Sequence, residues 1–279
     1  MKNGLDEVDR FVFNAIRLAV SVIVLLTFAM RERMNGRRIA AGLSWKKIVV
    51  YSAIVSGLYQ LLFLLGISRT TSGNTALIIS TIPMWTALLA TSFLNEKLLK
   101  IAWLGLFLAL GGTVLVALQK GDVDVGSENL MGNLCILGAA FAWAIGTVYS
   151  RPMLKQISPM QLSAFAAAMA LPFHLSIAGG NYTASWPALQ STEIWLIILY
   201  SGILSTGLAL PLWNFGVRHA GAAHAAVIQN LVPVVAIVAA WLTRDEVAST
   251  AQIVGGVMIL GGLLIMRLGR SPAVVPPKS

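Results

Sequence analysis

Nine long apolar runs, separated by short polar connections, limit most strongly what this chain of 279 residues can form. Crossing the hydrocarbon core of a bilayer takes about 20 predominantly apolar residues in a helix. The runs lie at residues 11–30, 48–67, 73–94, 101–118, 131–150, 160–177, 194–215, 222–243 and 250–268. No connection between them is long enough to hold another folded domain. We therefore predict an all-α polytopic transmembrane helical bundle with nine spans.

The overall composition excludes an ordinary soluble enzyme. Hydrophobic residues make up 57% of the chain and charged residues only 11%, against roughly 25% charged residues in soluble domains. The net charge of +9 would suggest nucleic acid as the partner of a soluble domain. In this chain the apolar excess indicates a membrane protein, so the positive charge does not indicate nucleic acid. We expect membrane lipids and no nucleic acid as partners.

The distribution of basic residues predicts the orientation of the spans. Fourteen of the 20 Lys and Arg residues lie in alternate connections and the C-terminal tail, five lie on the opposite side, and Arg17 lies within the first span. Cytoplasmic loops carry the excess of positive charge in membrane proteins. We therefore expect the C-terminus in the cytoplasm and the N-terminus outside.

The chain repeats itself at an offset of 150 residues, so that residues 66–118 align with 216–268 without a gap. Pro83 then matches Pro233, Glu96 matches Glu246, and several glycines match. The same register leaves the span at 131–150 without a counterpart before Met1. Five crossings reverse the direction of the chain, so two five-helix halves would be inverted repeats. We predict a ten-helix plan without its first span; a misassigned start codon, a truncated chain and a genuine nine-helix protein all remain open.

The repeated motif carries a resemblance to a known family. The two copies are IPMWTALLATSFLNEKLLKIAWLGLFLALGG and VPVVAIVAAWLTRDEVASTAQIVGGVMILGG, and FNAIRLAVSVIVLL and LCILGAAFAWAIGTVYSR add further similarity. Over residues 10–268 the chain resembles the EamA-like family of the drug/metabolite transporter superfamily. The resemblance implies a first repeat at 1–118, holding helices 2–5 of the family plan, a second at 131–268, holding helices 6–10, and a cytoplasmic tail at 269–279. It also implies a permease of the bacterial inner (plasma) membrane, often an exporter.

Two prolines at matched positions point to a substrate cavity. Pro83 and Pro233 lie in the middle of their spans, where proline removes a backbone donor and is expected to kink the helix. Interrupted helices near the membrane midplane are typical of transporter sites. Polar and aromatic residues at similar depth are the predicted substrate-binding set, with bonding between helices as the alternative for each. They are Tyr59, Gln60, Ser80, Trp85, Trp143, Asn214, Gln229 and Asn230.

A second set of residues could form gates or couple transport to an ion. It comprises Arg17, Asn74, Glu96, His174, His224 and Glu246. Each also has a structural interpretation. Arg17 could extend to the membrane interface as an anchor, and the two glutamates could stabilise the positive ends of the helices that follow them. Asn74 and His224 could be helix-start residues, and His174 could be a packing residue.

No motif in the sequence predicts catalysis, a metal site or a cofactor. The single cysteine, Cys135, excludes a disulfide framework. We therefore predict a permease, not an enzyme, that exports or exchanges small metabolites such as amino acids by alternating access around a midplane cavity. The alternatives are a truncated protein that does not transport and a membrane-embedded enzyme that modifies lipids. A small-molecule substrate is expected, and a homodimer is an open alternative.

Overall fold

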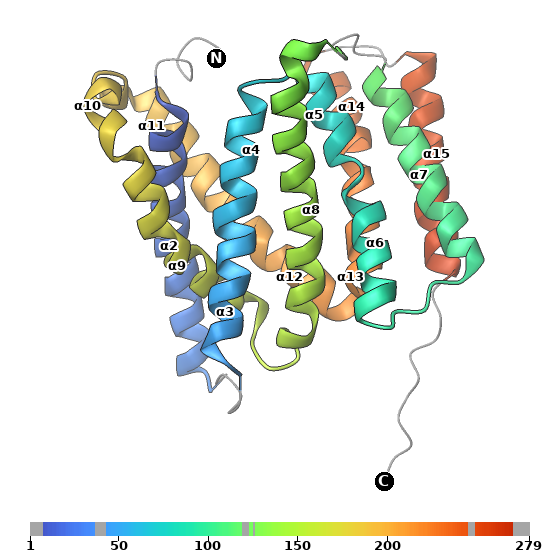
Figure 1. Cartoon of the computed structure of the whole chain (residues 1–279), viewed down its shortest axis with the longest axis horizontal. Coiled ribbons are helices and arrows are strands. Elements are labelled where there is room, and N and C mark those ends of the chain that lie inside the picture. The colour runs from blue at the N-terminus through green and yellow to red at the C-terminus, as the bar shows by residue number, and fades with distance from the viewer. Residues whose placement is uncertain (1–7, 37–42, 119–122, 125, 245–248, 270–279) are drawn as a thin grey trace. The chain divides into compact units, whose positions relative to one another are not determined.

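The computed structural model describes residues 8–36, 43–118, 123–124, 126–244 and 249–269. The regular elements in these ranges are helical (Figure 1). The helices are α2 (Arg10–Met34), α3 (Trp45–Ser52), α4 (Tyr59–Ile67), α5 (Ser72–Ile79), α6 (Ile82–Phe93), α7 (Lys100–Leu118), α8 (Leu130–Met153), α9 (Pro159–Ala178), α10 (Tyr182–Ser185), α11 (Thr192–Tyr200), α12 (Ala209–Ala220), α13 (Ala222–Val227), α14 (Val232–Arg244) and α15 (Thr250–Leu268). Shorter segments join them: π-helices η1 (Ala53–Leu58) and η5 (Ser201–Leu208), and 3₁₀ helices η2 (Ser127–Asn129), η3 (Gly179–Asn181), η4 (Ala188–Gln190) and η6 (Ile228–Leu231).

The nine predicted spans are confirmed over the residues that the structure describes. Nine continuous helical stretches of 18 to 29 residues are long and apolar enough to cross a membrane. Several combine two or three of the named helices, as Trp45–Ile67 joins α3, η1 and α4. The predicted boundaries differ mainly in the sixth stretch, Pro159–Ser185, which extends through α10 beyond the predicted end at 177. The chain is a multi-pass membrane protein.

The chain divides into two compact units, each made from both halves of the sequence. The first unit contains Met1–Leu65 and Ile145–His219, and the second contains Gly66–Ala144 and Ala220–Ser279. Each unit therefore holds helices that the repeat relates by an offset of 150, such as α2 with α9 in the first and α7 with α15 in the second.

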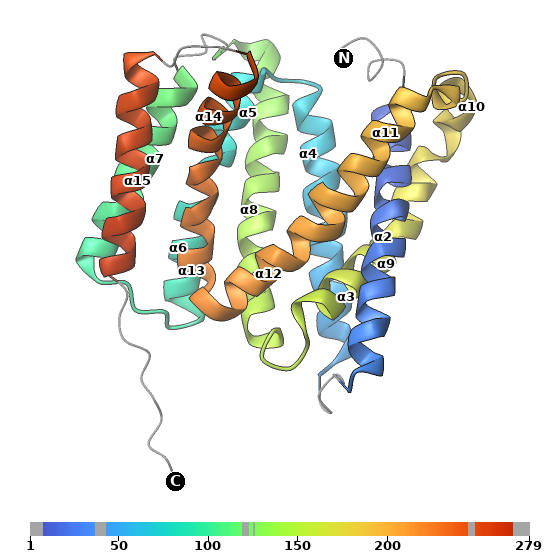
Figure 2. The same ribbon diagram turned by 180° about the vertical axis from the view of Figure 1, so that it is seen from behind.

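In the first unit, the repeat-related helices α2 and α9 lie side by side and antiparallel (Figure 1, Figure 2). Asn14, near the start of α2, contacts His174 near the end of α9. Ser158, which caps the start of α9, donates a hydrogen bond to Glu32 near the end of α2. Antiparallel pairing of corresponding helices is what an inverted repeat requires.

In the second unit, α7 and α15 are also repeat-related and antiparallel, and glycines line their interface. A Cβ added at Gly105 would lie 2.6 Å from the Gly262 carbonyl oxygen, and one at Gly112 would lie 2.5 Å from that of Gly255. Because Gly105 matches Gly255 and Gly112 matches Gly262 in the repeat, the two contacts are reciprocal. Small residues of this kind let helix backbones approach closely in membranes. We call these four residues the glycine seam.

Both prolines lie at helix starts instead of inside kinked helices. The third span breaks at Ser80 and Thr81, so Pro83 occupies the first turn of α6. The eighth span passes from α13 through η6, and Pro233 is the second residue of α14. In the first turn a backbone N–H has no partner within the helix, so proline is tolerated there. Each span is therefore interrupted where a kink was expected. Ser80 and Asn230 lie at these interruptions, at matched positions of the repeat.

Two π-helical segments also occupy matched positions of the repeat, in the first unit. Shifting η1 by 150 residues gives 203–208, which lies within η5. π-helical turns are rare and often occur at functional sites. Ser56 in η1 and Thr206 in η5 are counterparts, and both accept hydrogen bonds from the polar cluster described below.

Candidate functional site

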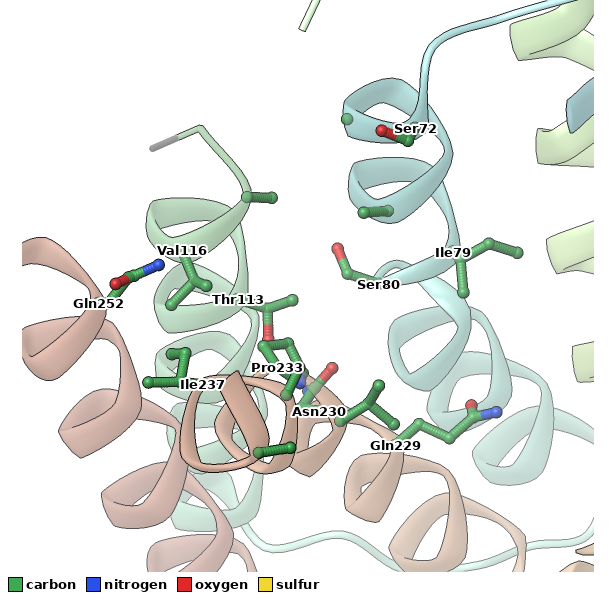
Figure 3. A pocket seen from close by; sticks show the side chains of 16 residues that line it. Ser72, Ile79, Ser80, Thr113, Val116, Gln229, Asn230, Pro233, Ile237 and Gln252 are labelled. Carbon is green, nitrogen blue, oxygen red and sulfur yellow. The ribbon is translucent and has the colours of Figure 1, made fainter. Parts of the chain in front are cut away.

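The second unit contains a cavity of about 680 Å³ between α5, α7, η6–α14 and α15 (Figure 3). This volume is in the range of small-molecule sites. Its lining comes from both halves of the sequence: Ser72, Gly73, Ala76, Ile79, Ser80, Thr113, Val116, Ala117, Gln229, Asn230, Val232, Pro233, Ala236, Ile237, Ala239 and Gln252. None of these lining residues is charged or a histidine.

The cavity lies at the two helix breaks. Ser80 and Asn230 are counterparts in the repeat, and each lies at the interruption of its span. Figure 3 shows the Ser80 hydroxyl pointing from its helix into the open space, with Asn230 between this helix and the one that carries Thr113. Matched interruptions therefore place one hydroxyl and one amide in the same cavity.

Two side-chain atoms of the cavity are buried without a hydrogen-bond partner. They are Nδ2 of Asn230, a residue only 2% exposed, and Oε1 of Gln229. A buried polar group that makes no hydrogen bond costs stability. Such groups in a native structure call for a functional or structural explanation.

The cavity contains part of the predicted substrate-binding set. Ser80, Gln229 and Asn230 line it together with Pro233. Trp85 and Trp143 belong to the same unit but are not among the lining residues. The Trp85 indole N–H donates to Thr81 at 3.1 Å, and its ring packs edge-on against Phe141. Thr113 and Gln252 were missed by the sequence reasoning; their positions on spans that carry the glycine seam were the available signal.

Tyr59, Gln60 and Asn214 lie in the first unit, apart from the residues that line the cavity. Asn214 is fully buried, donates to Ser163 Oγ at 2.9 Å and accepts from the Tyr51 hydroxyl at 3.2 Å. It therefore joins three helices, which is the alternative role considered for each polar residue. Tyr59 packs against Phe63, with ring centroids 5.9 Å apart.

Arg17 is half-buried at the centre of a polar cluster in the first unit. Its guanidinium donates to Asn14 Oδ1 at 2.6 Å, to Thr206 Oγ1 at 3.0 Å and to Gln60 Oε1 at 3.5 Å. These partners come from α2, η5 and α4, and all are neutral. The side chain thus joins neighbouring helices, and within the described residues no carboxylate pairs with it.

The directions of the hydrogen bonds in this cluster follow from Arg17. Since a guanidinium only donates, Asn14 must accept through Oδ1, so its Nδ2 donates to Nδ1 of His174 at 3.2 Å. The imidazole then carries its proton on Nε2, which donates to the Ser56 carbonyl at 2.6 Å. His174 is 2% exposed, and both of its ring nitrogens are engaged. This geometry gives His174 a packing role in this conformation.

Glu96 stabilises a different helix from the one expected. The sequence placed it before α7, but its carboxylate accepts from the backbone N–H groups of Ala222 and Ala223 at 3.0 and 3.3 Å, at the start of α13. The preceding Gly221 has φ of +96°, and a Cβ there would lie 3.1 Å from Glu96 Oε1. The sequence did not indicate this contact, because proximity along the chain does not show which helix terminus the folded chain brings to the carboxylate.

The remaining predicted gate residues lie at helix starts or outside the described residues. Asn74, in the first turn of α5, donates to Thr70 Oγ1 at 3.1 Å and accepts from the Asp124 backbone N–H at 3.1 Å, so it fixes a connection. His224 lies in α13. Glu246 lies outside the described residues. In the described part of the chain, no three His, Cys, Asp or Glu residues are grouped to hold a metal ion.

Comparisons with known proteins bear on the whole chain. The sequence model of the EamA-like transporter family matches residues 1–118 and 130–268. A Bacillus subtilis (strain 168) protein named "Uncharacterized transporter YoaV" is 26% identical over 271 residues, covering 95% of this chain and 89% of that protein. A Streptantibioticus cattleyicolor protein named "Probable terminal-alkyne amino-acid exporter" is 25% identical over 274 residues, covering 96% and 88%.

A solved crystal structure supports the fold. It superposes with a TM-score of 0.80 over 96% of this chain and 91% of that chain, at 19% sequence identity. The shared fold therefore covers nearly the full length of both chains. The family match over both halves of the sequence, with relatives named as transporters, leads to one conclusion: the chain belongs to the EamA-like transporter family and is a multi-pass membrane transporter.

Proposed function

We propose that the protein exports or exchanges small metabolites, amino acids or related compounds, across a bacterial inner membrane. Transport proceeds by alternating access around the cavity of the second unit. The C-terminus lies in the cytoplasm and the N-terminus outside, following the excess of positive charge in alternate connections.

The observation that carries this proposal is the cavity at the paired helix breaks. Ser80 and Asn230 are equivalent residues of an inverted repeat, and both line one space of small-molecule size. Breaks at corresponding positions of inverted repeats are the arrangement in which secondary transporters hold their substrates. Among the relatives, the protein named as a probable amino-acid exporter supports the choice of amino acids and related compounds.

Arg17 is the gate residue of this proposal. Its guanidinium joins α2 to Thr206 of η5 and to Gln60 of α4. A relative movement of these helices during transport must break and remake the bonds, which is the behaviour of a gate. Replacing Arg17 by Leu is expected to lower the transport rate about tenfold, a loss of ~1.4 kcal/mol. The exposed Arg33→Leu variant of the same helix is the control. Equal rates in both variants would exclude the gate role.

Flux in proteoliposomes tests the proposed function. The full chain is reconstituted, and uptake of a labelled amino-acid panel is measured with and without an imposed pH gradient, against protein-free vesicles. Saturable uptake of at least one member is the expected result. Dependence on the gradient would identify an antiporter, and independence would identify a facilitator. Uptake by correctly folded protein that never exceeds that of protein-free vesicles would contradict the proposal.

A further inference from the structure

Four polar side-chain atoms of the cavity have hydrogen-bonding roles that follow from their contacts. Ser80 Oγ donates to the Leu77 carbonyl of its own span at 2.6 Å, and Thr113 Oγ1 donates to the Ala109 carbonyl at 3.0 Å. A hydroxyl has one hydrogen, so both oxygens offer only lone pairs to the cavity. Gln229 Oε1 adds a buried acceptor without a partner, and Asn230 Nδ2 adds a buried donor without one. Of these four atoms, three are acceptors and one is a donor.

Within the described residues, the cavity lining contains no Asp, Glu, Lys, Arg or His. These residues therefore provide no charge to compensate a charged ligand group. Removing an ammonium or a carboxylate from water without a partner of opposite charge is costly. A carboxylate, which only accepts, would also face the acceptor oxygens of Ser80, Thr113 and Gln229. The group that fits is uncharged and both donates and accepts hydrogen bonds.

We propose that this cavity binds the carboxamide group of a small substrate. A primary carboxamide has two N–H donors and one carbonyl acceptor, so its carbonyl can accept from Asn230 Nδ2 while its NH₂ group donates to Gln229 and to a hydroxyl. Either orientation of the two side-chain amides allows this pairing, because a carboxamide both donates and accepts. The alkyl segment next to the carboxamide packs against Ile79, Val116 and Ile237.

This inference deepens the transport proposal and rests on it, because it takes the bound carboxamide to be part of the transported substrate. Among amino acids and related compounds, it selects those that carry a carboxamide or another uncharged group with both N–H and C=O. The adjacent ammonium and carboxylate of such an amino acid compensate each other's charge. A site that hydrogen-bonds a particular group rejects the isostere that lacks the matching atoms, because its own buried polar atoms are then left unpaired.

Binding of a matched pair of probes tests the inference on the unmodified protein. Benzamide and benzoate share one ring and differ in carrying an amide or a carboxylate. Their dissociation constants are measured by isothermal titration on the purified full chain in detergent at pH 7. Benzamide is expected to bind at least tenfold more tightly than benzoate. Equal affinity, tighter benzoate or no benzamide binding would overturn the assignment, and none of these results requires a variant to fold.

Variants assign the binding to these residues. Asn230→Leu and Gln229→Leu are each expected to weaken benzamide at least tenfold, whereas the exposed Gln156→Leu is expected to leave its affinity unchanged. Thermal unfolding separates ligand contact from a structural role. Because Asn230 Nδ2 makes no hydrogen bond in the fold, Asn230→Leu is expected to keep or raise the melting temperature while losing benzamide. Unchanged benzamide affinity in Asn230→Leu would contradict the proposal.

Failure of this inference and failure of the transport proposal are separable. Amino-acid flux without benzamide preference would overturn only the carboxamide site. Benzamide binding at Asn230, with no saturable flux of any substrate, would overturn transport and retain the site.

Discussion

The two units hold their repeat-related helices together by different means. In the first, polar side chains join the helices: Arg17, Asn14 and His174 form a hydrogen-bonded chain that ends on the Ser56 carbonyl. In the second, the glycine seam joins α7 and α15 through backbone packing. The buried amides of the first unit are bonded, whereas two amide atoms of the second are not. The comparison teaches that buried polarity can stabilise a helix bundle or remain available for a ligand.

The largest expected effect comes from making the same substitution in both units. Asn14→Leu removes the link between Arg17 and His174 and is expected to lower the free energy of unfolding by about 3 kcal/mol, since a charged donor and an imidazole both lose a partner. Asn230→Leu is expected to leave the free energy of unfolding unchanged, because Asn230 Nδ2 has no hydrogen bond to lose. Thermal unfolding in detergent compares the two variants. Equal destabilisation would remove the distinction between the units.

A smaller effect is expected from breaking the glycine seam. In Gly112→Ala the new Cβ would lie 2.5 Å from the Gly255 carbonyl oxygen, so the helices must separate, at a cost of about 1–3 kcal/mol. Gly256→Ala meets nothing within 4 Å and is the matched control. Its expected change is zero or a gain of up to about 1 kcal/mol from higher helix propensity. Equal melting temperatures for the two variants would show that α7 and α15 are not held by this seam.

The smallest effect is expected at the Glu96 cap in the second unit. Glu96→Gln removes the negative charge at the start of α13 but keeps a carbonyl acceptor for Ala222. The expected loss is about 0.3–1 kcal/mol, the usual contribution of a charge at a helix terminus. Measuring it at low and at high salt sharpens the assignment, because a dipole effect shrinks with screening. A salt-independent loss would point to altered packing instead.

The sequence was sufficient to predict the fold class, because span length and hydropathy are properties of single segments. The nine spans needed only local patterns, and the repeat at an offset of 150 predicted which helices correspond. The site was predicted less completely. Ser80, Gln229 and Asn230 were found through their proximity to matched prolines, but Asn214 and Gln60 have equally polar side chains and belong to the other unit.

What the sequence did not reveal depends on contacts between distant segments. Asn14 lies three residues before Arg17 on the same helix, and that spacing was a usable signal. The acceptors Thr206 and Ser56 lie in π-helical segments, whose backbone departs from the regular period and which residue type alone does not indicate. The helix that Glu96 caps depends on how α6 and α13 pack.

Substrate exchange by the unmodified chain and by Asn230→Leu tests the central claim most directly. Both are reconstituted at equal amounts, and counterflow of labelled glutamine is measured with unlabelled glutamine or glutamate inside the vesicles. The account predicts saturable exchange with internal glutamine, little with glutamate, and at least a tenfold lower rate in the variant at an unchanged melting temperature. Equal exchange rates with internal glutamine and glutamate, unchanged in Asn230→Leu, would contradict the account.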